Sequence, residues 1–331
     1  PEGEEGAPTL RMVNNLKGSL RRHLHAALRV SANKEGVYAS TWAATYDHPE
    51  GALPQESNVM WKRSDVPAAA VRTTLRFRFG QFFNAKLARR YRRAYLRKRG
   101  DASGISDGRC PLCGGPDSGG HILGECPHAR MKAMYIARHD KAVRTVHKAL
   151  QRSPGGACYT ILDACRAEML PALGADAKRL PDWLLLGLPE AEKKLMRPDI
   201  LRVVGLRTAP TQQEIDDAVR YKHRHIIQIV EVGYTGDTQW QEKRRKKSSQ
   251  HSSLVEALRA EGWIVETHVI LVGRTGTVYK FCKGALLELG VTREAARSLL
   301  EKLSVQAVLA AHDIGMARRR LERERGRVGV G

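Results

Sequence analysis

The sequence predicts an α/β domain that follows a mainly helical region. Three observations support this fold class. Short runs rich in β-branched residues have the length and composition of strands: 199–206, 225–232 and 263–272, with Val278–Phe281 as a possible fourth. Helical stretches alternate with or follow these runs, at 239–261 and 283–312. Earlier in the chain, residues 10–31, 129–151 and 157–170 show helical spacing.

Net charge is the main indication of a partner. The chain of 331 residues has 56 Lys and Arg against 35 Asp and Glu, for a formal net charge of +21. Such an excess favours binding to nucleic acid, because neutralised phosphates release their counterions. The alternative is a basic protein that is merely soluble or ribosomal. No run approaches 18 consecutive apolar residues, so we expect no membrane partner.

The first part of the chain is expected to be a disordered start, residues 1–9, and a basic helical linker region, residues 10–108. The opening PEGEEG lacks Met, which suggests a piece of a longer protein. Within 71–99, aromatic residues alternate with basic ones, a pattern that suits nucleic-acid binding. The candidate contacts are Arg76, Arg78, Lys86, Arg89, Arg90, Arg92 and Arg93. The alternative is an amphipathic helix whose aromatic residues are buried.

A cysteine cluster at 109–128 predicts a zinc knuckle. Cys110, Cys113, His121 and Cys126 stand within 17 residues, in CPLCGGPDSGGHILGEC. Three thiolates and one imidazole are the ligands of a closed, tetrahedral structural Zn²⁺ site. His128 is an alternative ligand, but His121 is preferred because Ile122 and Leu123 beside it can pack a small core. The knuckle could bind nucleic acid or only hold two helices together.

Proline and glycine residues divide the rest of the chain. Residues 129–180 are expected to be a helical connector, and the Pro- and Gly-rich stretch 171–190 contains the boundary. Residues 181–312 are predicted to form the α/β domain, and residues 313–331 a basic tail.

Two acidic residues are the candidate catalytic metal ligands. Asp199 follows Arg197-Pro198 and leads into one apolar strand, and Glu231 ends the next. Carboxylates at neighbouring strand ends can hold Mg²⁺ or Mn²⁺, which would act on a phosphodiester as Lewis acid and activate water. The alternative for Asp199 is a Pro-Asp turn, as at Pro181-Asp182. Two weaker acidic candidates are Glu192 and Asp237.

A lysine is expected to complete the site. An arrangement Glu-x-Lys would place it at position 233, which is Gly, so it must come from the helix that follows. Lys243, Lys247 and His251 recur at helical spacing and share one face. Lys247 is the preferred catalytic lysine and Lys243 the second choice. The alternative is a basic face exposed to solvent.

Taken together, the motifs CPLCG…HILGEC, MYIARHDKAV (Met134–Val143), RPDIL, IVEVGYTGD and the lysine helix resemble one known arrangement. The chain resembles, over roughly residues 70–285, the C-terminal part of site-specific non-LTR retrotransposon polyproteins of the restriction-like endonuclease clade. The resemblance implies an α/β restriction-endonuclease-like domain of the PD-(D/E)xK type, preceded by a mainly helical linker with a small zinc knuckle.

The resemblance also implies a function. The chain would nick double-stranded target DNA to prime reverse transcription, with structural Zn²⁺ and catalytic Mg²⁺ or Mn²⁺. Asp199 and Glu231 would bind the catalytic metal, and Lys247 would be the nuclease lysine. The Arg138-His139 pair would contact nucleic acid, and Arg197 and Arg244 are further candidates for this role.

The implied partners are the target DNA, the element's RNA and an upstream reverse transcriptase domain, in the nucleus and a reducing environment. His251 stands where a tyrosine often closes the lysine helix, and the gap between the two acidic residues is long, which puts the choice of lysine in doubt. The chain has no paired-aspartate polymerase motif. Two alternatives are a non-catalytic DNA- or RNA-binding module of a decayed element, and a repair or junction-resolving nuclease.

Overall fold

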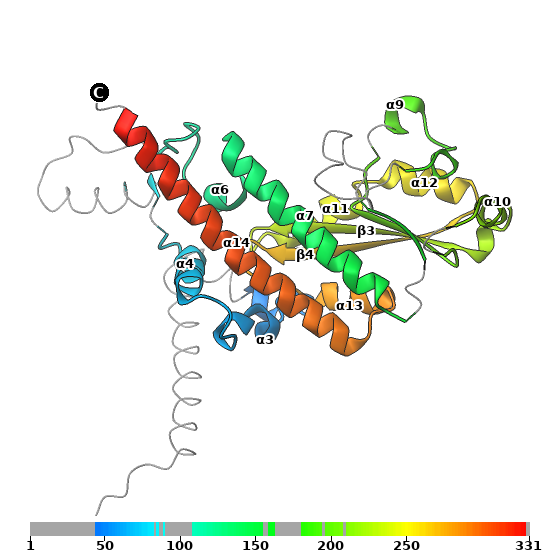
Figure 1. Ribbon diagram of the computed structural model, residues 1–331, viewed down its shortest axis with the longest axis horizontal. Coiled ribbons are helices and arrows are strands. Elements are labelled where there is room, and N and C mark those ends of the chain that lie inside the picture. Colours follow the sequence, from blue (N-terminus) through cyan, green and yellow to red (C-terminus); the bar gives the residue numbers. More distant parts are fainter. Residues whose placement is uncertain are drawn as a thin grey trace, which may run out of the picture. The chain divides into compact units, whose positions relative to one another are not determined.

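Four strands form one mixed sheet in the order β1-β2-β3-β4 in this computed structural model (Figure 1). They are β1 Tyr159–Leu162, β2 Ile200–Val204, β3 Ile226–Thr235 and β4 Ile264–Gly273. All four are rich in Ile, Val and Leu, whose branched or bulky side chains pack well on a pleated surface. The sheet confirms the predicted α/β fold class.

The register of the strands leaves half of β3 without a neighbour on one side. β2 pairs antiparallel with β1 and with β3, and its first residue, Ile200, lies opposite Val230. β4 pairs parallel with β3 along its whole length, from Ile226↔Ile264 to Thr235↔Gly273. Beyond Val230, therefore, this edge of β3 is not paired with β2, and other groups can bind the backbone of β3 there.

Two hydrophobic clusters cover the two faces of the sheet. On one face, Val230 and Val232 pack with residues of α7 (Ala129–Gln151), α13 (Lys280–Glu288) and α14 (Arg293–Val328) (Figure 1). On the other face, Ile227 and Ile229 pack with α10 (Gln212–Arg220), α12 (Ser252–Ala260) and the segment around Leu184. Because side chains alternate along a strand, Glu231 points to this second face.

The remaining elements are short or lie toward the start of the chain. They are α3 (Pro54–Ser57), η1 (Val59–Trp61), α4 (Ala68–Arg78), α6 (Gly119–Gly124), η3 (Asp182–Leu184), α9 (Glu190–Lys193), η4 (Lys222–Arg224) and α11 (Trp240–Ser248). The helix α4 and the η1 turn pack on α14 through Ala70, Val59, Met60 and Val308. No helix among the described residues has the length and apolar character needed to cross a membrane.

The structure describes residues 44–82, 84–85, 89, 108–154, 158–162, 180–193, 196–207 and 210–328. The chain divides into two compact units, Pro1–Gly51 and Ala52–Gly331. In the first, residues 44–47 form a helical turn. All elements named above belong to the second. The predicted start (1–9) and the helix at 10–31 lie outside the described residues.

Two predictions about elements were wrong, at 159–162 and at Val278–Phe281, and two others, the helical stretch 239–261 and the basic tail, are refined. Residues 159–162 form a strand instead of a helix, because Tyr, Thr, Ile and Leu pair with β2 at the sheet edge. The stretch 239–261 is two helices, α11 and α12, interrupted at 249–251. Val278 makes only an isolated bridge to Val272, and α13 follows. The basic tail continues α14 as far as Val328, because Leu321 and Arg318 on it are buried.

Candidate functional site

The two predicted acidic residues meet at the open edge of β3. Asp199 comes just before β2, and its Oδ2 accepts a hydrogen bond from the backbone N–H of Val232 at 2.7 Å. In return, the N–H of Asp199 donates to Glu231 Oε1 at 3.3 Å. Both carboxylates are buried, with 5% exposure for Asp199 and 0% for Glu231. The strand register that ends the β2–β3 pairing at Val230 therefore creates the place where they meet.

Lys247 of α11 lies between the two carboxylates. Its Nζ is 3.0 Å from Asp199 Oδ2 and 2.6 Å from Glu231 Oε2. The stem of this side chain passes over Gly233, where a Cβ atom would lie 3.4 Å from Lys247 Cε and 3.2 Å from Leu271 Cδ2. The glycine that excludes an ordinary Glu-x-Lys arrangement thus also provides the space through which the helical lysine reaches the site.

The preferred lysine and the second choice differ in position. Lys247 is 9% exposed and forms ion pairs with both carboxylates. Lys243, one turn earlier, is half-buried, and its Cε lies 3.9 Å from a Cβ built at Gly233. Burial, together with the nearby charges of Lys247 and Arg274, lowers the pKa of Lys243. The structure therefore brings Lys247 into the cluster and leaves Lys243 beside it.

His139 of α7 enters the same cluster from the other face of the sheet. Its Nε2 lies 3.3 Å from Asp199 Oδ1 and 3.2 Å from the carbonyl oxygen of Val232, and its Nδ1 lies 3.4 Å from Asp140 Oδ1. Burial opposes the charge on this imidazole, but hydrogen bonds to Asp140 and Asp199 outweigh it and raise its pKa to about 10. At neutral pH the ring is therefore a cation.

These cations determine the protonation of Asp199. Burial by itself would raise the pKa of this carboxyl group, but the hydrogen bond from His139 and the charge of Lys247 outweigh it and lower the pKa to about 2. The pKa of Lys247 is raised, because the two carboxylates outweigh the effect of its burial. The cluster thus consists of two buried carboxylates balanced by the buried ammonium of Lys247 and the half-buried imidazole of His139, which is how buried charges are tolerated.

A second histidine faces Glu231. His251 lies in the interruption between α11 and α12, is 5% exposed, and places Nε2 2.9 Å from Glu231 Oε1. The two atoms are close, but their geometry is not that of a hydrogen bond. Neither ring nitrogen of His251 has a hydrogen-bond partner among the described residues. We call Asp199, Glu231, Lys247, His139 and His251 together the acidic cluster.

Sequence reasoning did not place the two histidines in the cluster. His139 was expected to contact nucleic acid, and His251 was placed on the same helix face as the lysines but was given no role in the site. The helical spacing of Lys247 and His251 was a usable signal, because it puts both on the side that faces the sheet. No local signal marks His139, since its position depends on α7 crossing the open edge of β3.

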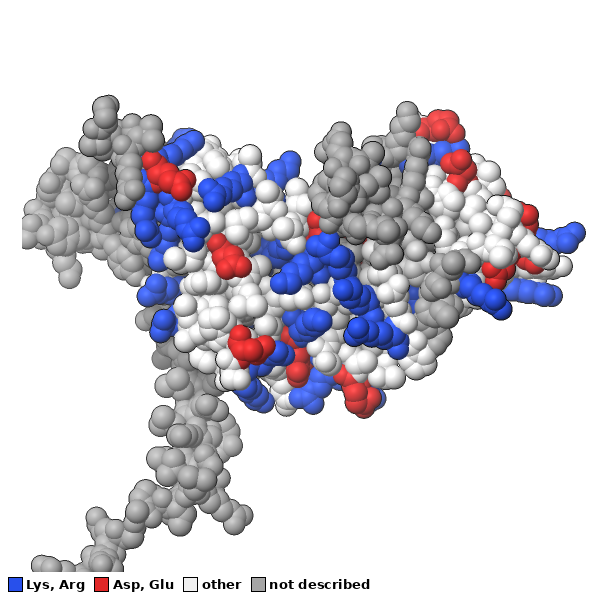
Figure 2. Space-filling model, viewed as in Figure 1, with Lys and Arg blue, Asp and Glu red and all other residues white. Residues whose placement is uncertain are grey.

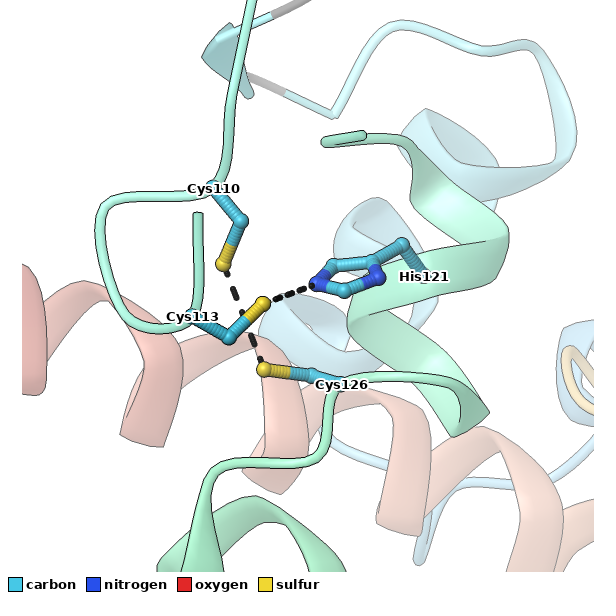
Figure 3. Close-up of side chains that lie close together, drawn as sticks. All are labelled: Cys110, Cys113, His121 and Cys126. Carbon is cyan, nitrogen blue, oxygen red and sulfur yellow. Dashed lines mark hydrogen bonds between the residues drawn. The ribbon is translucent and has the colours of Figure 1, made fainter. Parts of the chain in front are cut away.

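The four predicted knuckle residues converge on one point (Figure 3). Cys110 Sγ is 4.0 Å from Cys126 Sγ, Cys113 Sγ is 3.3 Å from His121 Nε2, and all four ligand atoms lie within 4.8 Å of one another. A tetrahedral zinc ion with bonds of about 2.3 Å to sulfur would hold its ligand atoms at separations similar to those found here, so the group could hold a zinc ion. Burial lowers the pKa of His121, which favours the neutral, metal-binding form.

Local geometry shapes the knuckle. Gly114 has a positive φ of 75°, and its N–H donates to the carbonyl of Cys110 at 2.8 Å, closing the turn between the first two cysteines. Ser118 caps α6 by accepting a hydrogen bond from the N–H of His121 at 3.0 Å. His128, the alternative ligand, lies at the N-terminus of α7 and outside the group.

The predicted nucleic-acid contacts fall into three groups. Arg76, Arg89 and Arg197 are exposed, and Arg244 is partly buried with its guanidinium 4.4 Å from the centre of the Phe281 ring. Arg78 and Arg138 are buried and bind backbone carbonyls, so we reassign both to structural roles. Lys86, Arg90, Arg92 and Arg93 lie outside the described residues.

The weaker acidic candidates do not join the cluster. Asp237 accepts a hydrogen bond from the hydroxyl of Thr277 at 2.6 Å and so fixes the turn after β4. Glu192 lies on the short helix α9, where no residue is buried. No protein-family model matches the chain, and no curated protein has a similar sequence, so its functional assignment depends on the geometry of the two sites.

Proposed function

We propose that this chain is a metal-dependent DNA endonuclease whose active site is the acidic cluster. The single observation that carries the proposal is the Lys247 ammonium held between Asp199 and Glu231, at 3.0 Å and 2.6 Å. Two carboxylates and a lysine on one face of a sheet edge are the groups that phosphodiester hydrolysis needs. Their burial beside charged partners is typical of functional sites.

The donor set suits a hard divalent cation. Carboxylate oxygens are the ligands that Mg²⁺ prefers, and Mg²⁺ keeps several waters, so two protein carboxylates suffice. Among the described residues, the zinc knuckle is the only group of three or more His, Cys, Asp or Glu side chains placed to hold a metal ion by themselves, so the proposed Mg²⁺ site depends on two carboxylates and on water. Asp199 and Glu231 would hold the ion, and when bound it would supply a Lewis acid and a more acidic water.

The residues of the chain have separate roles in this proposal. Asp199 and Glu231 would present their oxygens to the ion. The N–H of Val232 orients the Asp199 carboxylate, and the N–H of Asp199 orients that of Glu231, at the open edge of β3. Lys247 offsets negative charge that develops on the phosphate and positions the attacking water. His139, as a fixed cation, holds Asp199 in place from the opposite side. Lys243, which lies beside the cluster on the same face of α11, is available to bind a neighbouring phosphate.

The charge of the surface supports a nucleic-acid substrate. Figure 2 shows basic side chains gathered over α7 and over the C-terminal end of α14. On α7 the exposed basic residues are Arg130, Lys132, Lys141 and Lys148, and on the end of α14 they are Arg320, Arg323 and Arg325. Because His139 lies on α7 too, a strand that follows this helix would pass close to the acidic cluster. Electrostatic attraction of this kind falls with rising salt.

We also propose a specific fold family and biological role for this nuclease. A zinc knuckle followed by this cluster supports a restriction-endonuclease-like domain that nicks double-stranded target DNA during retrotransposon integration. Its partners would then be the element's RNA and a reverse transcriptase domain of the same polyprotein, in the nucleus. The cut that such a role requires leaves a 3′-hydroxyl group, which can be extended.

Nicking of a supercoiled plasmid with Mg²⁺ tests the proposal. We expect the wild-type chain to nick, and Asp199→Asn to reduce the rate at least about a hundredfold, since charge at the reacting centre is worth that much. Asp182→Asn is the matched control, because it alters an exposed Pro-Asp carboxylate outside the cluster. Equal rates for the wild type and Asp199→Asn would contradict the proposal, and DNA binding without nicking would favour a binding module.

Two further arms separate the kinds of nuclease. Mapped ends with a 3′-hydroxyl support a priming role, whereas their absence argues against it. A branched DNA junction cut much faster than linear duplex would favour a repair or junction-resolving enzyme over a target-site nickase.

A further inference from the structure

One helix joins the zinc knuckle to the acidic cluster. α7 begins at Ala129, soon after the last cysteine ligand, Cys126, and it carries His139, whose Nε2 lies 3.3 Å from Asp199 Oδ1. A straight helix transmits a shift of its first turns to its later ones because its backbone is hydrogen-bonded throughout. The position of His139 therefore depends on how the start of α7 is held.

Arg138, next to His139, binds the knuckle and β3 at once. Its Nη1 donates to the carbonyl of Leu123 on α6 at 2.9 Å, and its guanidinium lies 4.2 Å from the centre of the Tyr234 ring on β3. The side chain is 7% exposed. Tyr234 is in the same strand as Glu231, so this one guanidinium connects α6, α7 and the strand that carries the catalytic carboxylate.

Tyr135 holds the same part of the knuckle one turn earlier on α7. Its hydroxyl donates to the carbonyl of Ile122 at 2.7 Å and lies 3.3 Å from the carbonyl of His121, the zinc-binding histidine. The backbone carbonyls of α6 are thus bound by side chains of α7. Their geometry depends on His121 and Cys126 being held in place, which is what a zinc ion would do.

The opposite side of the knuckle is fixed by two more arginines. Arg274, just after β4, donates from Nη1 to the carbonyl of Gly120 at 2.9 Å and pairs with Glu125 at 2.8 Å. Its own N–H donates to the carbonyl of Thr235 at the end of β3. Arg318 of α14, 1% exposed, lies 3.5 Å from the buried Asp117.

From these contacts we infer that the zinc knuckle is a positioning element of the acidic cluster, acting through Tyr135 and Arg138 on His139. A separately tethered finger that only binds nucleic acid would not have its helix carbonyls bound by arginines from β4 and α7. In this role a bound zinc ion would hold α6, α6 would hold α7 through Tyr135 and Arg138, and α7 would hold the His139 ring against Asp199. The inference concerns the arrangement of the site, and only its nicking arm rests on the proposed function.

Hydrogen exchange of the full chain tests the inference without a substrate. The N–H of Val232 donates to Asp199, so exchange in a peptide covering β3 beyond Val230 reports whether the cluster is closed. We expect removal of zinc to accelerate exchange at least about tenfold there and in α7 around His139, as well as in the knuckle itself. Exchange in α10 and in α12 should not change, because these helices pack in the other hydrophobic cluster.

The variant Arg138→Gln separates the positioning role from zinc binding. It keeps all four zinc ligands, and zinc content is measured to check this. We expect it to open the same β3 peptide with zinc bound. Arg78→Gln is the matched control, because Arg78 is also a buried arginine that binds backbone carbonyls, those of Ser57 and Thr275. Tyr135→Phe, which removes one hydroxyl, is the milder variant if Arg138→Gln does not fold.

Unchanged exchange at β3 in zinc-free protein and in Arg138→Gln would overturn the inference, with opening confined to residues 108–128. Nicking at saturating DNA gives the second readout, and Arg138→Gln should slow it by about tenfold to a hundredfold, as second-layer contacts do elsewhere. If the exchange changes occur but the wild-type chain does not nick, the positioning role stands and the proposed function fails. If the wild-type chain nicks DNA and exchange is unaffected, the proposed function stands and the positioning role fails.

Discussion

The zinc knuckle and the acidic cluster are both made of buried ionisable side chains, but they are assembled in different ways. The knuckle takes its four ligands from one short segment, between Cys110 and Cys126, and a metal ion would neutralise its thiolates. The acidic cluster takes its residues from α7, from the position just before β2, from β3, from α11 and from the turn after α11. It balances two carboxylates with the cations of Lys247 and His139.

The difference teaches where each region draws its stability. A knuckle without metal loses the bonds that fold it, because its own core is small. The acidic cluster lies on a sheet with a hydrophobic cluster on each face, so the strands that carry it stay folded when the metal is lost. Loss of one partner in the cluster, however, leaves a buried charge without its counterion, and this is costly.

The largest effect should come from the knuckle. We expect Cys113→Ser to abolish stoichiometric zinc binding and to unfold residues 108–128, because structural zinc provides on the order of 10 kcal/mol to such elements. Far-UV circular dichroism should still show the sheet and α14. Cys158→Ser, a buried thiol outside the knuckle, should keep full zinc content. Loss of the whole fold in Cys113→Ser would remove the distinction between the two regions.

The next effect should come from Lys247. We expect Lys247→Met to reduce the nicking rate at least about a hundredfold, because it removes the positive charge beside the carboxylates. Lys246→Met is the control on the same helix, since Lys246 is exposed and pairs only with Glu242 at the surface. Similar loss in both variants would show that α11 acts through general charge and not through this one ammonium.

A smaller effect is expected at Gly233. A Cβ atom there would come within 3.2 Å of Leu271 and 3.4 Å of the Lys247 stem, so Gly233→Ala should destabilise the fold by about 1–3 kcal/mol. Urea denaturation measures this. The change should also slow nicking more than it weakens DNA binding, and Gly284→Ala on α13 serves as a control because no atom lies within 4 Å of the added carbon. Full activity in Gly233→Ala would mean that Lys247 does not need the space over Gly233 to reach the carboxylates.

A further effect is the pH dependence of His139. Because the folded-state pKa of His139 is raised to about 10, its contribution to stability should be complete below about pH 6.5 and be lost as the pH rises toward 10. The difference in unfolding free energy between the wild type and His139→Gln should therefore shrink from pH 6 to pH 10. A difference that stays constant over this range would show that the imidazole is not charged in the fold.

The two regions also differ in how far sequence alone predicts them. The four knuckle ligands are fixed by their spacing, and the structure brings all four together. Asp199, Glu231 and Lys247 could be predicted because Asp199 leads into a recognisable strand, Glu231 lies in the next one, and Lys247 lies on the helix that follows. The arrangement around them could not, since β1, the continuous α14 and the approach of His139 depend on packing between segments far apart in the chain.

The central claim is that Asp199 and Glu231 hold a divalent cation beside Lys247. Electron paramagnetic resonance of Mn²⁺ added to the zinc-loaded full chain measures this directly. We predict one site that Glu231→Gln abolishes, and that Lys247→Met retains or strengthens because the competing ammonium is gone. Mn²⁺ affinity that is unchanged by Glu231→Gln would contradict the claim.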